Sequence, residues 1–296
     1  MTEEIDVSRT ENGNETVSFD MQEWIKQKRT EREQAFRMMD GMAQRIKEKN
    51  GDLRAFLDLM VRFPNYSVGN LLLIAAQKPD ATDLRAFSEW KSLGTSIKKG
   101  QTGILLLERG SEYTRRDGTA GRNYNTKRLF DVSQTRALKN PPIRFPTDYS
   151  RLFRAVMEIS PCEIVVDEEM NIFHHQDAVF DEEAGNIRIA ITNDLERLIT
   201  PLIREVSKAY MSAGDAAPEH MDAAASCIAY AVSIRQGIEL EDFSLAESAK
   251  AIKELEDVRE VKKVLGRIRD VTSSILEDMD SYFRSGREVP VSEAVR

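Results

Sequence analysis

The amino-acid sequence predicts an α+β fold in which each of two modules combines helices with a small sheet. Apolar residues recur at three- and four-residue spacing over most of the chain, which is typical of amphipathic helices. Two groups of short apolar runs of strand length interrupt this pattern, near residues 104–132 and near residues 163–191. A proline-containing segment, residues 141–147, separates the two groups, and 296 residues suit two domains. We therefore expect one domain over residues 19–140, a linker, and a second domain over residues 148–296.

Helices are expected to form the start of the first domain. The apolar spacing over residues 20–60 predicts one or two amphipathic helices with a break at Asn50–Asp52. A serine begins the segment 67–77 and is suited to be the N-cap of a further helix there. A threonine and an aspartate begin the segment 82–94, which is also expected to be helical and to stop at its final glycine.

A small antiparallel sheet is expected to follow these helices. Ile104–Leu107 is an apolar run of strand length, and Arg128–Val132 is its predicted partner strand. Residues 110–126 between the two runs are polar and rich in glycine and arginine. We therefore expect an exposed hairpin loop in that segment.

The second domain is predicted to begin with a helix over residues 148–159 and to continue with a small sheet. Its expected strands are residues 163–166, 171–174 and 186–191. The remaining segments are expected to be helical and are residues 194–213, 218–236, a segment that starts at Asp242 or Ser244, and 253–283. The apolar stripe along the last of these helices suits either a coiled-coil seam or packing within its own domain.

The composition excludes several classes of protein. The chain has 41% hydrophobic and 31% charged residues, which excludes a wholly disordered chain. It has no apolar run near the roughly 18 residues that span a bilayer, which excludes a membrane protein. Residues 1–18 are polar and acidic, lack the order of a signal peptide, and are expected to form a disordered tail. Cys162 and Cys227 are too few for a disulfide framework or a cysteine-based zinc site. We expect a cytoplasmic protein that does not bind a membrane.

The charged residues are distributed unevenly along the chain. The net charge of −8 divides into −3 for residues 1–60, +8 for residues 61–145 and −13 for residues 146–296. A basic segment inside an acidic chain indicates a face that binds a polyanion such as nucleic acid. The alternative is that the acidic remainder neutralises this segment through a contact between the domains.

Aromatic residues accompany the cations of the basic segment. Cations neutralise phosphates, and aromatic faces stack unpaired bases, so the combination favours single-stranded nucleic acid over a duplex. Tyr66, Trp90 and Tyr124 are the candidates for stacking, although Trp90 also suits a position in the core. Asn70 and Gln134 are candidates for polar contacts. The candidate cations are Lys98, Lys99, Arg115, Arg116, Arg122, Lys127 and Arg128.

Motifs for catalysis are scarce. The histidines are His174, His175 and His220, and the first two would point to opposite faces of a strand, so they are not suited to bind one metal together. The sequence contains no HExxH, no GxSxG and no phosphate-binding loop. We assign no catalytic residue, no metal and no cofactor.

Five segments of the first domain carry a resemblance to a known family. They are Asn65–Ile74, Gln77–Thr82, Phe87–Gly94, Ile97–Ile104 and Phe130–Thr135. In this order they resemble the N-terminal domain of ArdC-type antirestriction proteins, a module that also begins plasmid TraC primases and LtrC-like proteins of conjugative elements. The resemblance covers about residues 20–140 and implies binding of single-stranded DNA.

The second domain resembles the C-terminal region of the same family, a zinc-metallopeptidase-like domain with an HExxH helix. At the place of that motif this chain has Arg204-Glu205-Val206-Ser207-Lys208, so of the family's catalytic positions only the glutamate remains. Two cations stand where neutral imidazoles would bind Zn²⁺, and the nearest carboxylate to the position of the downstream ligand is Asp222. We therefore predict a pseudo-metallopeptidase without bound zinc, in which Glu205 or a nearby acid forms ion pairs with Arg204 or Lys208.

The sequence thus predicts a non-catalytic protein of a conjugative or other mobile element that binds single-stranded DNA and protects or handles transferred DNA. One alternative is an interaction protein whose basic module docks an acidic partner, such as a restriction or conjugation protein. An active zinc metallopeptidase is the other alternative, and the missing histidines argue against it.

Overall fold

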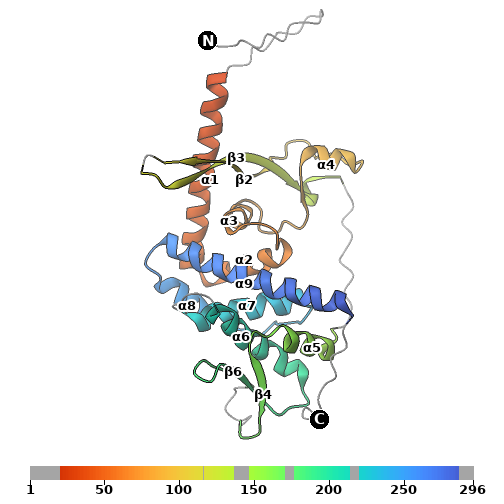
Figure 1. The fold of residues 1–296 in the computed structure, drawn as a ribbon. Helices are drawn as coiled ribbons and strands as arrows, with labels where there is room; N and C mark the ends of the chain where they lie inside the picture. Colours follow the sequence, from red (N-terminus) through yellow and green to blue (C-terminus); the bar gives the residue numbers. More distant parts are fainter. Residues whose placement is uncertain (1–20, 116, 137–146, 171–176, 214–219, 287–296) are drawn as a thin grey trace, which may run out of the picture.

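Two small sheets lie at opposite ends of the molecule, with helices packed between them (Figure 1). The computed structural model describes residues 21–115, 117–136, 147–170, 177–213 and 220–286. The mixture of helices and small sheets confirms the predicted α+β fold class. The predicted tail and all but the last residue of the predicted linker lie outside the described residues, so the domain boundary stays a prediction.

The first helices follow the predicted pattern closely. They are α1 (Met21–Glu48), α2 (Asn50–Arg62) and α3 (Val68–Gln77). Lys49 separates α1 from α2, immediately before the interruption predicted at Asn50–Asp52. Ser67 caps α3 as expected, because its hydroxyl accepts a hydrogen bond from the N–H of Asn70 at 3.4 Å.

The first sheet is antiparallel in the order β1-β3-β2, and its strands are β1 (Leu84–Arg85), β2 (Ile104–Thr114) and β3 (Ala120–Asp131). The prediction of an exposed loop over residues 110–126 is wrong, because β2 and β3 pair through most of that segment. Tyr113 lies opposite Gly121, and its ring is so close that a Cβ at Gly121 would come within 2.5 Å of it. The glycine that suggested a loop instead provides room for a cross-strand aromatic ring.

The helix predicted over residues 82–94 is shorter than expected. Only α4 (Phe87–Ser92) is helical, because the preceding residues of β1 pair with β3. The N–H groups of Thr82 and Asp83, which were expected to cap a helix, donate to the carboxylate of Asp131 at 2.7 and 3.1 Å. A contact distant in sequence therefore overrides the local capping signal.

Helix α3 closes the free edge of strand β2 with two side-chain amides. Asn70 donates from Nδ2 to the carbonyl of Leu107 and accepts from the N–H of Leu107, both at 2.9 Å. Gln77, two turns further on, makes the same pair of bonds with Leu105 at 2.9 Å. Leu105 and Leu107 are two residues apart, so their peptide groups point to the same side of the strand, away from β3. The two amides therefore act as a substitute for a fourth strand.

The second sheet is mixed and has the order β4-β6-β5, with β4 (Glu163–Asp167), β5 (Ala178–Asp181) and β6 (Asn186–Ala190). Strand β4 runs parallel to β6, whereas β5 is antiparallel to it. Strand β5 was not predicted, and the strand predicted over residues 171–174 lies outside the described residues. Helices α5 (Tyr149–Ile159) and α6 (Leu195–Ser212) pack against each other beside this sheet.

The last helices lie across the middle of the molecule (Figure 1). They are α7 (Met221–Arg235), α8 (Ala246–Glu254) and α9 (Val258–Ser285), so the helix predicted over residues 253–283 is interrupted between α8 and α9. The apolar stripe of α9 is buried in its own chain, which favours packing over a coiled-coil seam. None of the described helices combines the length and the apolar composition needed to cross a bilayer.

One hydrophobic core continues from the first helices into the last ones. Buried side chains of α1 and α2 belong to the same cluster as those of α7 and α9. Polar groups reinforce the contact, since the hydroxyl of Tyr230 donates to Asp58 at 2.6 Å and Arg54 donates to the same hydroxyl at 3.2 Å. Burial next to Asp58 raises the pKa of Tyr230 to about 12. The two predicted domains thus pack together closely.

Replacement of Gln77 by methionine is expected to destabilise the protein. The substitution leaves the N–H and the carbonyl of Leu105 without their partner, and each unsatisfied buried group costs roughly 1–3 kcal/mol. The free energy of unfolding, measured by urea titration, should fall by at least about 2 kcal/mol. Gln27→Met on the exposed face of α1 is the matched control and should stay within about 0.5 kcal/mol of the wild type. Equal stability of the two variants would contradict the role of the amide.

Candidate nucleic-acid interface

A hollow of about 630 Å³ lies between α1, α3, the β2–β3 hairpin and α9. Its volume is in the range of roughly 300–1,000 Å³ that is typical of small-ligand sites. The aromatic, polar and cationic side chains that line it are Phe36, Asn65, Tyr66, Ser67, Asn70, Arg109, Tyr124, Lys127 and Arg269. Four of the residues predicted from the sequence are therefore brought together here, namely Tyr66, Asn70, Tyr124 and Lys127.

The aromatic rings of the hollow are held by edge-to-face contacts. Tyr124 packs against Phe36 with ring centroids 6.1 Å apart and planes at 85°, and Tyr66 packs against Phe63 at 5.7 Å and 90°. Burial, with the nearby acids Glu89 and Asp83, raises the pKa of the Tyr66 hydroxyl above its ordinary value. Phe36 remains 42% exposed. The rings are thus oriented by the protein and still reach solvent.

The cations of the hollow come from two parts of the chain. Arg109 and Lys127 lie on the hairpin, and Lys127 forms an ion pair with Glu108 at 3.4 Å. Arg269 comes from α9, more than 120 residues later. Sequence reasoning did not select Phe36, Arg109 or Arg269. Phe36 matched the core spacing of a helix, and only the tertiary fold brings Arg269 to this place.

Asn70 lines the hollow, but its amide is already bonded on both sides to Leu107. Its observed role is therefore to position α3 beside the hairpin. The prediction that it also contacts a nucleic acid is not tested by this geometry.

The other predicted cations lie outside the hollow, and several are engaged with the protein. Lys98 donates to the carbonyl of Ser133 at 2.9 Å, and Arg115 closes the hairpin turn by donating to the carbonyl of Ala120 at 3.0 Å. Arg122 pairs with Glu112 across the strands. Arg128 donates to the carbonyl of Gly103 at 3.0 Å and lies 3.4 Å from Glu31 of α1. Lys99 is exposed, and Arg116 lies outside the described residues.

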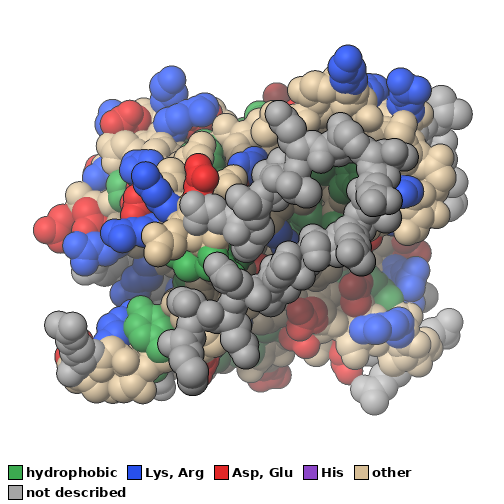
Figure 2. Space-filling model, turned by 90° about the horizontal axis from the view of Figure 1, so that it is seen from above, with side chains coloured by type: hydrophobic (Ala, Val, Ile, Leu, Met, Phe, Trp, Pro, Cys, Tyr) green, Lys and Arg blue, Asp and Glu red, His purple; other side chains and the backbone are tan. Residues whose placement is uncertain are grey.

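Figure 2 views the molecule from the end that carries the first sheet. Lys and Arg side chains stand out along much of the outline of this face, with acidic side chains between them. Basic and acidic side chains thus alternate on this face, and the ion pairs of Arg122, Lys127 and Arg128 partly neutralise the predicted cations.

Trp90 and Gln134 are corrections to the predicted contact residues. Trp90 is only 3% exposed, and its indole N–H donates to the carbonyl of Phe130 at 2.8 Å. Gln134 is 7% exposed, and its amide bonds to the carbonyl of Thr102 at 2.8 Å and the N–H of Asp131 at 2.9 Å. Both side chains face the core, so neither offers a surface to a base.

Asp131 of the Phe130–Thr135 segment has a structural role. Its carboxylate is fully buried and accepts hydrogen bonds from the N–H groups of Thr82, Asp83 and Ser133. Burial raises the pKa of this carboxyl, but these hydrogen bonds outweigh it and hold the pKa below its ordinary value. The Asp131 carboxylate therefore connects the end of β3 to Thr82 and Asp83, the residues immediately before β1.

A cluster of four charged side chains lies where the family resemblance places the HExxH motif. Glu205 of α6 is 3% exposed and accepts from the N–H of Phe180 in β5 at 2.9 Å. The ammonium of Lys208 bridges Glu205 at 2.9 Å and Asp222 at 2.6 Å. Arg204 makes the same bridge, at 3.5 and 2.9 Å. The predicted ion pairs of Glu205 with Arg204 and Lys208 are present.

The cluster does not suit a metal ion. Two cations already balance its two carboxylates, and a dication placed among them would be repelled. Hydrogen bonding from Lys208 holds the pKa of Asp222 below its ordinary value. In the part of the chain that the structure describes, no three His, Cys, Asp or Glu side chains form a metal-binding group.

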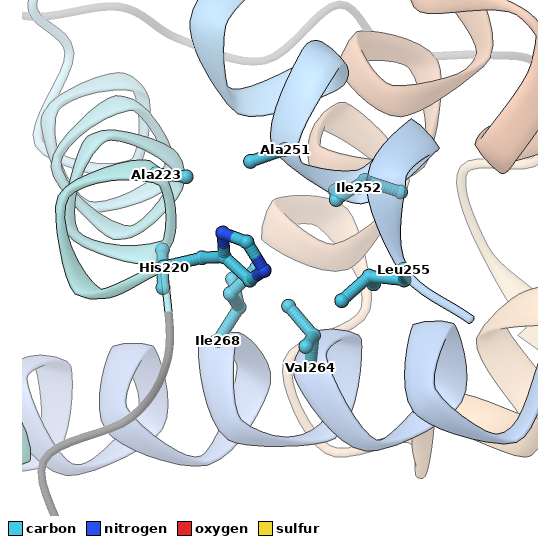
Figure 3. A pocket seen from close by; sticks show the side chains of 8 residues that line it. His220, Ala223, Ala251, Ile252, Leu255, Val264 and Ile268 are labelled. Atoms are coloured by element: carbon cyan, nitrogen blue, oxygen red, sulfur yellow. The ribbon is translucent and has the colours of Figure 1, made fainter. Parts of the chain in front are cut away.

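The described histidine, His220, does not join this cluster. His220 points into a small apolar pocket between α7, α8 and α9, where Val264 and Ile268 are among its neighbours (Figure 3). His174 and His175 lie outside the described residues.

A family model matches part of the first half of the chain, and two solved structures are similar over a larger part of it. Residues 27–137 match the family model of the N-terminal domain of anti-restriction factor ArdC, which confirms the resemblance for this segment. Similar solved structures include the metal-free and Mn(II)-bound crystal structures of the antirestriction ArdC protein from R388 plasmid. Each is 15% identical with a TM-score of 0.48, covering 73% of this chain and 86% of that chain. No curated protein matches the sequence.

Replacement of Lys208 by methionine is expected to lower stability, because it removes one partner of the buried Glu205. A buried charge left without any partner costs about 3–5 kcal/mol; Glu205 keeps Arg204 at 3.5 Å, so urea unfolding should show a smaller loss than that. Lys250→Met on the exposed face of α8 is the matched control and should change stability by less than about 0.5 kcal/mol.

Adding Glu205→Gln to Lys208→Met should recover part of the loss, since the glutamine still accepts from Phe180 and no buried charge remains. A double variant as unstable as the sum of the two single variants would show that the two side chains are not coupled.

Proposed function

We propose that residues 19–140 form a domain that captures single-stranded DNA in the hollow and that the protein acts in antirestriction. The observation that carries this proposal is the meeting of Tyr66, Tyr124 and Lys127 in one hollow, inside the segment that matches the ArdC N-terminal domain. Aromatic rings stack on unpaired bases of any sequence, and the cations neutralise the phosphates that follow them. A base in a duplex is not available for such stacking, so the hollow favours a single strand.

Exposed cations outside the hollow extend this mechanism. Lys98, Lys99 and Arg122 are exposed residues of the same proposed domain and would guide the strand through long-range attraction. The acidic second half would repel DNA and confine it to this end. The biological setting in this proposal is a mobile element, where the cytoplasmic protein protects or handles transferred DNA, with a restriction or conjugation protein as a further partner.

We further propose that residues 148–296 form a domain without peptidase activity. Two observations support this: Arg204 and Lys208 stand at the ligand positions of the motif, and both are paired with Glu205 and Asp222. A glutamate that is neutralised in this way is not free to act as a general base toward a metal-bound water. Packing of α7 and α9 against α1 and α2 supports a scaffolding role for this half.

The binding proposal predicts tighter binding of a labelled oligothymidylate of about 16 nucleotides than of a duplex of the same length. The logarithm of the affinity should fall steeply with the logarithm of salt concentration between about 50 and 200 mM. Tyr124→Ala should cost about 1–3 kcal/mol of binding, while Tyr124→Phe should bind as the wild type does. Tyr113→Ala, on the same hairpin but outside the hollow, is the control.

Fluorescence anisotropy measures each affinity. Absence of binding at low salt would refute the proposal and would favour the alternative in which the basic surface docks an acidic protein. Equal losses of binding affinity for Tyr113→Ala and Tyr124→Ala would show that the hollow is not the binding site.

The second proposal predicts that the purified protein does not retain stoichiometric Zn²⁺ or Mn²⁺ after dialysis, as measured by elemental analysis. The double substitution Arg204→His and Lys208→His should create metal binding, because two neutral imidazoles then join Glu205 and Asp222. Stoichiometric metal in the wild type, with peptidase activity that is lost in Glu205→Gln, would refute the proposal.

A further inference from the structure

We infer that Arg269 of α9 is a phosphate-binding residue of the hollow, so that the two halves of the chain build the DNA site together. The inference rests on the proposed function and adds a residue that lies outside the segment matching the ArdC N-terminal domain. It assigns a direct binding role to the second half of the chain, which the proposed function treats as a scaffold.

Helix α9 is placed to reach the hollow. It lies across the middle of the molecule in Figure 1, and it contacts both α1 and α3. Arg269 donates from Nη2 to the carbonyl of Pro64 at 3.3 Å, in the turn that also carries Asn65 and Tyr66. This bond holds the guanidinium next to the turn that carries Tyr66, one of the stacking candidates.

The guanidinium has hydrogen-bonding capacity left over. Of its five N–H donors, the structure engages one with Pro64 and one with the carboxylate of Asp270 at 2.8 Å. The Nε–H is shielded and has no acceptor among the described residues. The side chain is 27% exposed, so the remaining donors on its terminal nitrogens can reach a ligand in the hollow.

The charges around the hollow favour a phosphodiester as that ligand. Arg109 and Lys127 from the hairpin face the same space as Arg269, and Glu108 is the acidic residue among the described lining. A base stacked on Tyr66 or Tyr124 would bring its phosphate to this group of cations. The planar guanidinium suits phosphate oxygens because it can donate two parallel hydrogen bonds to them.

Arg269→Gln in the full-length chain tests the inference, with the labelled oligothymidylate as the probe. Loss of one phosphate contact should reduce the slope of log affinity against log salt by about 0.7, which corresponds to about fivefold weaker binding at 0.1 M salt. Arg269→Lys, which retains a point charge, should keep most of the slope. Arg259→Gln is the matched control, because Arg259 is on the same helix, is 90% exposed and does not line the hollow.

A second variant acts in the opposite direction and does not disturb the anchor to Pro64. Asp270→Asn removes the carboxylate that partly neutralises Arg269, and its side chain is 70% exposed, so folding should be unaffected. This variant should bind the oligonucleotide more tightly than the wild type and with a steeper salt slope.

The outcomes distinguish failure of the role of Arg269 from failure of DNA binding by the protein. If the wild type binds with a steep salt dependence but Arg269→Gln and Asp270→Asn both match it, the inference is wrong and the proposed function stands. If the wild type does not bind, the proposed function itself fails. A variant of Arg269 that weakens binding equally at all salt concentrations would show a structural role and would also overturn the inference.

Discussion

The free edge of strand β2 sets the constraint on which the first half of the structure depends. Backbone groups at a sheet edge need partners, and here α3 supplies them through Asn70 and Gln77, which are seven residues apart on one helical face. Because each amide donates and accepts at once, the helix has one allowed register along the strand. With α3 in that register, Tyr66, which precedes the helix, lines the same hollow as Tyr124 of the hairpin.

The second half of the chain supports the helices and the hairpin that line the hollow. Helix α9 packs beneath α1 and α3, and the core passes between the halves without interruption. A binding surface formed by one hairpin would move with that hairpin. In this protein, Glu31 of α1 holds Thr126 of the hairpin at 2.7 Å and Arg269 holds the turn before α3, so the walls are fixed relative to each other. Such preorganisation would reduce the entropy lost when the hollow binds the proposed single strand.

Periodicity and capping signals were sufficient to predict α1, α2, α3 and the main helices of the second half, since these depend on local spacing. They failed where a distant group decides the local structure. Asp131 captures the amides of Thr82 and Asp83 and prevents the predicted helix, and the fit of Tyr113 on Gly121 turns a predicted loop into paired strands. For the same reason the sequence indicated Tyr66, Tyr124 and Lys127 but not Arg269, and it did not decide whether Trp90 faces the core.

The charged cluster on α6 has a consequence for the conditions under which the protein can fold. A fold organised around a bound metal depends on the supply of that metal, because the binding energy is part of the folding energy. In this chain the positive charge between Glu205 and Asp222 is covalently attached, as the side chains of Arg204 and Lys208. On the proposal that this half binds no metal, these two side chains supply the counter-charge of the carboxylates, and its assembly would be independent of the metal content of the cell.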